Sequence, residues 1–113
     1  MKAKLDSGKL VRLAADVEAF EKLESVIHTK GRLAIVSVLA AVESLTFTEL
    51  RDLLKLTDGN LAAHLRALND AGYIVLNKRG DGKPATEISL SASGRNAFRH
   101  YLDGLEHIVK RHR

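Results

Sequence analysis

One helical segment, residues 58–71, carries polar side chains of the kind that hydrogen-bond to nucleic-acid bases. Leu61, Leu65 and Leu68 recur at helical spacing and form an apolar stripe for the core. Asparagine can form two hydrogen bonds with adenine and arginine two with guanine, and small neighbours let a helix lie deep in a major groove. An ordinary solvated face is the alternative for a single Arg or His. The face opposite the stripe, which we predict to contact bases, comprises Asn60, Ala63, Arg66 and Ala67, with His64 at its edge.

Three basic residues lie around the tip of a hairpin that we predict over residues 74–90. Residues 74–79 and 86–90 contain strand-like apolar side chains. Between them, the GDGKPA segment has turn-forming Gly and Asp and a Pro that cannot donate to a strand ladder. Lys78, Arg79 and Lys83 could contact phosphates or a minor groove, and a solvated basic turn is the alternative. Because the polar helix precedes this hairpin, we favour phosphate contact over a solvated turn.

The residues before the polar helix predict another helix and a tight turn. Thr46 can cap its start, and Glu49 completes a capping box in which each side chain satisfies a backbone donor of the other residue. Leu56 closes this helix, and Thr57 or Asp58 can cap the next one. The two segments therefore predict a helix-turn-helix.

A specific stop signal follows the polar helix. Gly72 can adopt a left-handed conformation after the last turn, and Tyr73 would then return an apolar contact to Leu68, as in a Schellman motif. The predicted hairpin comes next, which is the order of elements in a winged helix-turn-helix.

Apolar residues also recur at helical spacing at both ends of the chain, over residues 10–28 and 91–110. Leu33, Val36 and Leu39 of a middle helix already supply a small core, so the terminal seams have apolar area left for a second subunit. Packing of the two ends within one subunit is the alternative, although a two-fold dimer is the commonest oligomer. The predicted dimer interface comprises Leu10, Leu13, Val17, Phe20, Phe98, Tyr101, Leu102, Leu105 and Ile108.

The composition is typical of one soluble, helix-rich domain with a polyanionic partner. The chain has 113 residues, 45% hydrophobic content, a single Pro and a formal net charge of +4. The segment from Glu49 to Ala71 holds four acidic and three basic residues, so the positive charge lies at the wing and the termini. Without Cys, no disulfide or thiolate site is possible. The sequence has neither a long apolar run nor a signal peptide, which predicts a cytoplasmic protein without membrane contact.

Catalysis and metal binding find little support in the sequence. The aspartates of the helix-turn-helix have no paired His or phosphate-binding loop, and the serines lack a nucleophile-elbow context. His100, Asp103 and His107 share one stripe of the last helix, and His with carboxylate suits zinc or nickel. One helix, however, supplies no complete tetrahedral set. We therefore predict no enzymatic activity, no metal site and no cofactor.

Several motifs, in order, resemble those of winged-helix transcriptional regulators of the MarR/ArsR type. They are RLAIVSVL, TFTEL, LTDGNLAAHLRALNDAGYI, KRGDGKPAT and LSASGRNAF, all from Arg32 onward. The resemblance is greatest to the small group of winged helix DNA-binding domain proteins and covers roughly two thirds of the chain. It implies a homodimeric bacterial or archaeal DNA-binding regulator, with the polar face of residues 58–71 as recognition helix and Lys78, Arg79 and Lys83 in the wing.

The chain departs from this family pattern at two places. Relatives often carry a basic and an aromatic residue around the positions of Ala85 and Glu87, so we expect this wing to hold the DNA backbone less tightly. Relatives also commonly read LTPEGR where this chain reads LSASGR over residues 90–95. The last helix therefore lacks the Pro and Glu of a strong helix start.

Together these features predict a mainly α fold with a small β-hairpin wing (α+β) in a single domain over residues 1–113. A winged helix-turn-helix core over 30–90 would lie between dimerisation helices at 10–28 and 91–110. The predicted function is sequence-specific duplex DNA binding as a homodimeric transcriptional regulator, with residues 58–71 in the major groove and 74–90 on the backbone or minor groove. The alternatives are a protein-interaction winged-helix module and a metal- or small-molecule-responsive repressor, whose unidentified effector would bind between the terminal helices and the core.

Overall fold

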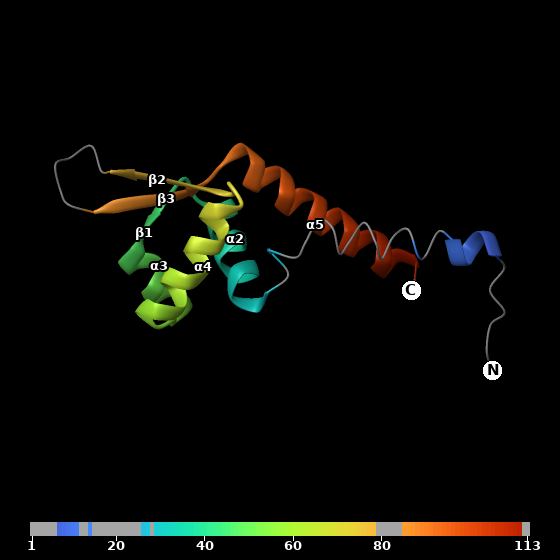
Figure 1. The fold of residues 1–113 in the computed structure, drawn as a ribbon, viewed down its shortest axis with the longest axis horizontal. Helices are drawn as coiled ribbons and strands as arrows, with labels where there is room; N and C mark the ends of the chain where they lie inside the picture. The colour runs from blue at the N-terminus through green and yellow to red at the C-terminus, as the bar shows by residue number, and fades with distance from the viewer. Residues whose placement is uncertain (1–6, 12–13, 15–25, 28, 79–84, 112–113) are drawn as a thin grey trace.

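The described residues form a small helical bundle with a short sheet along one side (Figure 1). This computed structural model describes residues 7–11, 14, 26–27, 29–78 and 85–111. The elements in chain order are α2 (Lys30–Ala41), β1 (Leu45–Thr46), α3 (Phe47–Leu54), α4 (Asp58–Asp70), β2 (Ile74–Lys78), β3 (Thr86–Leu90) and α5 (Ala92–Arg111). The predicted fold class, mainly α with a small β wing, is confirmed.

The hydrophobic core lies where α2 packs against α4, β3 and α5. The predicted leucine stripe of α4 faces this core, and all three of its side chains are buried. Ile35 and Leu39 of α2, Leu50 of α3 and Ile88 of β3 fill the space opposite the stripe. Burial of one face of α4 leaves its opposite face to solvent.

The predicted capping box begins α3. The Thr46 side chain accepts a hydrogen bond from the Glu49 N–H at 3.2 Å, and the Thr46 N–H donates to Glu49 Oε1 at 2.9 Å. Lys55, just after the helix, adopts a left-handed conformation with φ of 55°. Thr57 then caps α4 by accepting from the Asn60 N–H at 3.1 Å. Of the two caps predicted for α4, Thr57 is the one used.

A Schellman motif ends α4, as predicted. The Tyr73 N–H donates to the Leu68 carbonyl at 2.9 Å, and the Gly72 N–H donates to the Asn69 carbonyl at 2.9 Å. Gly72 has a φ of 77°, which glycine adopts without the steric cost of a Cβ. The chain therefore turns directly from α4 into β2.

The sheet has three antiparallel strands instead of the two of the predicted hairpin. β3 is the central strand, with Leu76 of β2 and Leu45 of β1 both opposite Ile88. The Ser44 hydroxyl also donates to Glu87 Oε2 at 3.3 Å. The two-residue β1 was missed because so short a strand has no alternation for a sequence pattern to detect. Glu87, at one of the positions where this chain departs from its relatives, therefore accepts a hydrogen bond within the sheet.

Ser91 connects the start of α5 to the end of α4. Its side chain accepts from the Gly94 N–H at 2.9 Å and donates to the Gly72 carbonyl at 2.6 Å, while its own N–H donates to the Tyr73 carbonyl at 3.0 Å. A Cβ at position 94 would overlap the Tyr73 carbonyl oxygen, so glycine permits this close approach. Ala92 and Ser93 occupy the positions of the Pro and Glu in the family pattern, and the Ser91 cap starts the helix without them.

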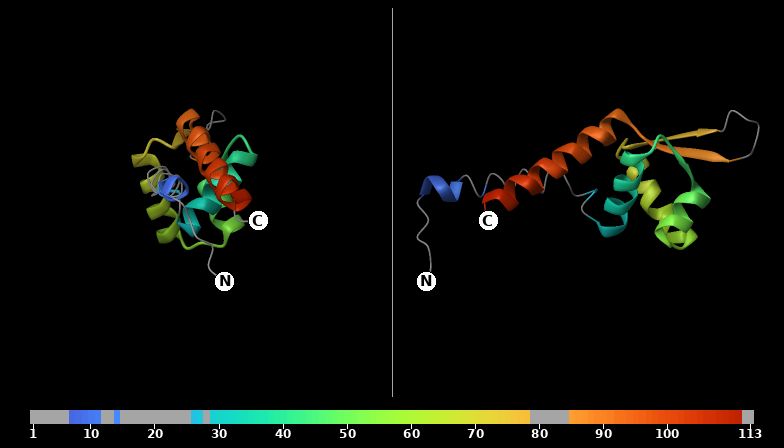
Figure 2. Two further views of the ribbon diagram at one scale, coloured as in Figure 1. Left: turned by 90° about the vertical axis from the view of Figure 1, so that its right-hand side faces the viewer. Right: turned by 180° about the vertical axis from the view of Figure 1, so that it is seen from behind.

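The long helix α5 runs away from α3 and α4 (Figure 2). Its bounds agree with the predicted helix over 91–110 within one residue. Within the described ranges, no helix is long and apolar enough to cross a bilayer.

Most of the predicted N-terminal helix lies outside the described residues. Residues 7–11 are helical, and Leu10 among them is half exposed. Val26 and Ile27 form a turn, in which Ile27 is fully buried in the core. The predicted interface residues that lie outside the described ranges are Leu13, Val17 and Phe20.

Candidate nucleic-acid interface

The outer face of α4 is the first part of the candidate interface. Asn60, Ala63 and Arg66 are exposed and follow one another at helical spacing, opposite the buried leucine stripe. Asn60 is held near the capped start of the helix, because its N–H is bonded to Thr57. The structure thus brings an amide, a methyl group and a guanidinium together on one solvent-facing strip.

His64 and Ala67, the other two residues predicted for this face, are half-buried. A Cβ built at Gly31 would overlap the His64 Nε2 and lie 2.8 Å from the His64 Cδ2. The imidazole therefore lies against the first turn of α2 instead of on the open strip. Gly31 makes this approach possible, which gives His64 a role in positioning α4 on α2.

Two carboxylates and one guanidinium lie together at the start of α4. Arg51 of α3 donates from Nη1 to Asp58 Oδ1 at 2.9 Å and from Nε to Asp52 Oδ1 at 3.0 Å. The hydrogen bonds to Asp58 and then to Asp52 raise the pKa of the Arg51 guanidinium. Since Asp58 and Asp52 are mostly exposed, the ion pairs contribute little to stability, but they neutralise the Arg51 guanidinium beside the start of α4.

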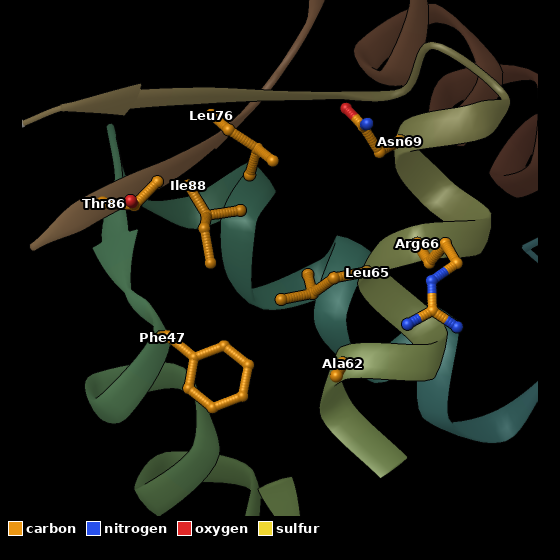
Figure 3. A pocket seen from close by; sticks show the side chains of 8 residues that line it. All are labelled: Phe47, Ala62, Leu65, Arg66, Asn69, Leu76, Thr86 and Ile88. Atoms are coloured by element: carbon orange, nitrogen blue, oxygen red, sulfur yellow. The ribbon is translucent and has the colours of Figure 1, made fainter. Parts of the chain in front are cut away.

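A hollow of about 330 Å³ separates α4 from the hairpin (Figure 3). Its lining includes Phe47 at the start of α3, Leu65 of α4 and Ile88 of β3. Leu76 of β2 projects into it and is 47% exposed. The polar residues around it are Arg66, Asn69 and Thr86.

The described part of the wing supplies one of the three predicted basic residues. Lys78, the last residue of β2, is exposed. The other two, Arg79 and Lys83, lie outside the described ranges. Lys78 therefore lies at the end of the strand whose Leu76 lines the hollow.

The apolar face of α5 lies away from this interface. Phe98, Leu102, Leu105 and Val109 follow at spacings of four, three and four residues, with Leu102 46% and Val109 53% exposed. Phe98 and Leu102 also line a second hollow of about 220 Å³, with Ala40, Arg95 and Arg99. Ile108 is half-buried, and Tyr101 is only 3% exposed. Tyr101 therefore belongs to the core of its own subunit, which corrects its predicted place in an open seam.

Some residues of the candidate interface were absent from the sequence prediction. Asn69, Leu76 and Thr86 come from three elements and meet only after the hairpin folds beside α4. The local signal for this hollow was the apolar run at the start of β2, in which Ile74 is buried but Val75 and Leu76 stay exposed. Among the described residues, no group of three His, Asp or Glu side chains is placed to hold a metal ion.

Comparison with known families and structures agrees with this arrangement. Residues 32–109 match the family model for the winged helix DNA-binding domain. An uncharacterized protein of Methanocaldococcus jannaschii is 36% identical over 78 residues, which cover 68% of this chain and 85% of that protein.

Two solved structures illustrate the likeness in fold. A transcriptional regulator homologue from Pyrococcus horikoshii has a TM-score of 0.78 at 23% identity, over 85% of this chain and 95% of that one. MepR of S. aureus, solved as a DNA complex, has a TM-score of 0.71 at 18% identity, over 93% of this chain and 86% of that one. At these identities the structures support the fold.

Proposed function

The chain belongs to the winged helix DNA-binding domain family, and we propose that it binds duplex DNA sequence-specifically, as a homodimeric transcriptional regulator. In this proposal α4 enters the major groove and the hairpin contacts the adjoining backbone or minor groove. The protein acts by binding and performs no catalysis.

The exposed strip of α4 is the observation that carries this proposal. Asn60 and Arg66 have the two side chains best suited to bidentate contacts with adenine and guanine, and Ala63 between them offers only a methyl group. Half-buried His64 and Ala67 lie at the edges of the strip. Lys78, with Arg79 and Lys83 of the wing, would supply phosphate contacts.

The apolar seam of α5 supports the dimeric part of the proposal. Leu102 and Val109 expose apolar area at coiled-coil spacing, which association with a second copy would cover. A two-fold axis along such a seam would present two copies of α4 to two half-sites of a palindrome. Leu10, Phe98, Leu105 and Ile108 are further candidates for this interface.

A small-molecule effector is a second candidate feature, favoured by the hollow beside α5. Arg95 and Arg99 give this hollow two cationic side chains, and it borders the proposed dimer seam at Phe98 and Leu102. An anionic ligand bound there would touch both the core and the dimerisation helix, and could thereby change the spacing of the two recognition helices.

Substitution of α4 and wing residues should separate base reading from phosphate contact. Arg66→Ala or Asn60→Ala should weaken binding to the preferred site by about 1 to 2 kcal/mol and relax the preference at one base pair. Lys78→Ala should weaken binding to all sequences alike and lower the salt dependence by about one counterion. Titration of labelled duplexes at several salt concentrations measures both. An Arg66→Ala protein that retains the full base preference would contradict the assignment.

Asp58 should limit binding to DNA of arbitrary sequence. Its carboxylate lies in the first turn of α4, where it would approach phosphates, so Asp58→Asn should raise affinity for a non-specific duplex by about threefold. Glu106→Gln is the matched control, because it makes the same charge change at a Lys110-paired residue of α5. Equal non-specific affinities of the two variants would show that Asp58 lies away from the DNA.

A further inference from the structure

We propose that the hollow between α4 and the hairpin binds one sugar–phosphate step of the DNA, with Asn69 and Thr86 as neutral hydrogen-bond donors to that backbone. This inference rests on the proposed function. It adds to that function a defined subsite and two contact residues that neither the base-reading strip nor the basic wing includes.

The position of the hollow indicates which part of the DNA binds in it. The major and minor grooves of a duplex are separated by one sugar–phosphate backbone. If α4 lies in the major groove and the hairpin reaches the adjoining minor groove, the strand between the two grooves has to pass between these elements. The hollow lies between α4 and the hairpin strands (Figure 3). The backbone of one strand therefore crosses it.

The surface of the hollow suits a deoxyribose better than a free anion or a base. Phe47, Leu65 and Ile88 give it apolar walls, and Leu76 keeps nearly half of its surface exposed there. A deoxyribose presents C–H groups that can cover such a surface, whereas a free phosphate ion would leave it uncovered. The exposed Arg66 at the edge gives the hollow charge complementarity to DNA.

Two neutral donors frame the apolar surface. Asn69 lies in the last turn of α4 and Thr86 begins β3, and their side chains come from opposite sides of the hollow (Figure 3). Both residues are exposed, and within the described ranges neither side chain has a hydrogen-bond partner. An amide and a hydroxyl can each donate to a phosphate oxygen, and such contacts fix the register of a protein on DNA without reading its sequence.

Neutral backbone donors have a distinct signature in binding experiments. Loss of Asn69 or Thr86 should weaken binding to every sequence by the same factor, because the backbone is common to all of them. The salt dependence should not change, since a neutral donor displaces no condensed counterion. Lys78→Ala would lower the salt dependence, and Arg66→Ala would change the base preference.

The test uses the full chain with the near-isosteric substitutions Asn69→Leu and Thr86→Val. Each should weaken binding by about tenfold, both to the preferred site and to a mixed-sequence duplex, with an unchanged salt slope. Asn96→Leu on α5 and Thr29→Val just before α2 make the same chemical changes at exposed positions that do not line the hollow, and the Thr29 side chain makes no capping bond. Both should bind like the unsubstituted protein. Equal unfolding midpoints would show that all four variants are folded.

Duplexes with single methylphosphonate substitutions locate the contact directly. For the unsubstituted protein, neutralising the phosphate in the hollow should weaken binding, and the Asn69→Leu/Thr86→Val protein should lose no further affinity at that phosphate. If both hollow variants bind DNA as tightly as the unsubstituted protein, this inference is wrong, although the proposed function still stands. If the unsubstituted protein binds no duplex, the proposed function and this inference both fail.

Discussion

Replacement of Leu102 and Val109 by Asp is expected to convert the proposed dimer into a monomer. Both side chains are about half exposed in one subunit, so the change should leave the winged core folded. In a two-fold seam, each carboxylate would lose water without gaining a partner, which should cost about 3 kcal/mol or more of dimer free energy. The dimer dissociation constant should therefore rise at least a hundredfold, as sedimentation equilibrium would measure.

DNA affinity should fall together with dimerisation in this variant, because two linked recognition helices bind a two-part site better than one. Leu53→Asp is the control, since Leu53 is 59% exposed on α3, outside the proposed seam. If the Leu102→Asp/Val109→Asp protein sediments like the unsubstituted dimer, the subunits associate through another surface.

Substitution of Gly94 by Ala is expected to destabilise the fold strongly. The added Cβ would overlap the Tyr73 carbonyl oxygen and lie 2.9 Å from its carbonyl carbon, so α5 would have to move. That movement would also strain the Ser91 N–H bond to the same carbonyl. The expected loss is about 2 to 3 kcal/mol in the free energy of unfolding, measured by urea titration at one fixed protein concentration.

Gly59→Ala provides the matched glycine control for this measurement. Gly59 lies within α4 and nothing is within 4 Å of a Cβ built there. The substitution should therefore stabilise the protein by about 0.5 to 1 kcal/mol, because Ala favours the helix more than Gly does. A Gly94→Ala protein as stable as Gly59→Ala would show that α5 adjusts to the new methyl group without cost.

The helix boundaries could be predicted from the sequence because their signals are local. Thr46 and Glu49, which form the capping box, are only three residues apart in the sequence. The stop at Gly72 likewise involves only the last turn of α4 and the residues that follow it. The leucine stripe of α4 likewise needs only helical periodicity to define its buried side. These signals identified both helices of the helix-turn-helix and the strand pair that follows.

The contacts between distant segments were not predictable in the same way. Spacing placed His64 at the edge of the outer face, but it did not show that Gly31 of α2 lets the His64 ring approach that helix. The close approach of Gly94 to Tyr73 and the pairing of β1 with β3 also depend on how separate elements meet. Helical periodicity assigns a side chain to a face, but it does not reveal which neighbour covers the edges of that face.

Selection of duplexes from a random-sequence pool by the purified full chain tests the central proposal of sequence-specific DNA binding most directly. We predict enrichment of an inverted repeat whose half-sites lie about one helical turn, roughly 10 bp, apart. Arg66→Ala should enrich the same repeat with one relaxed position per half-site. Recovery of no enriched sequence, together with no binding to any duplex at low salt, would contradict the proposal.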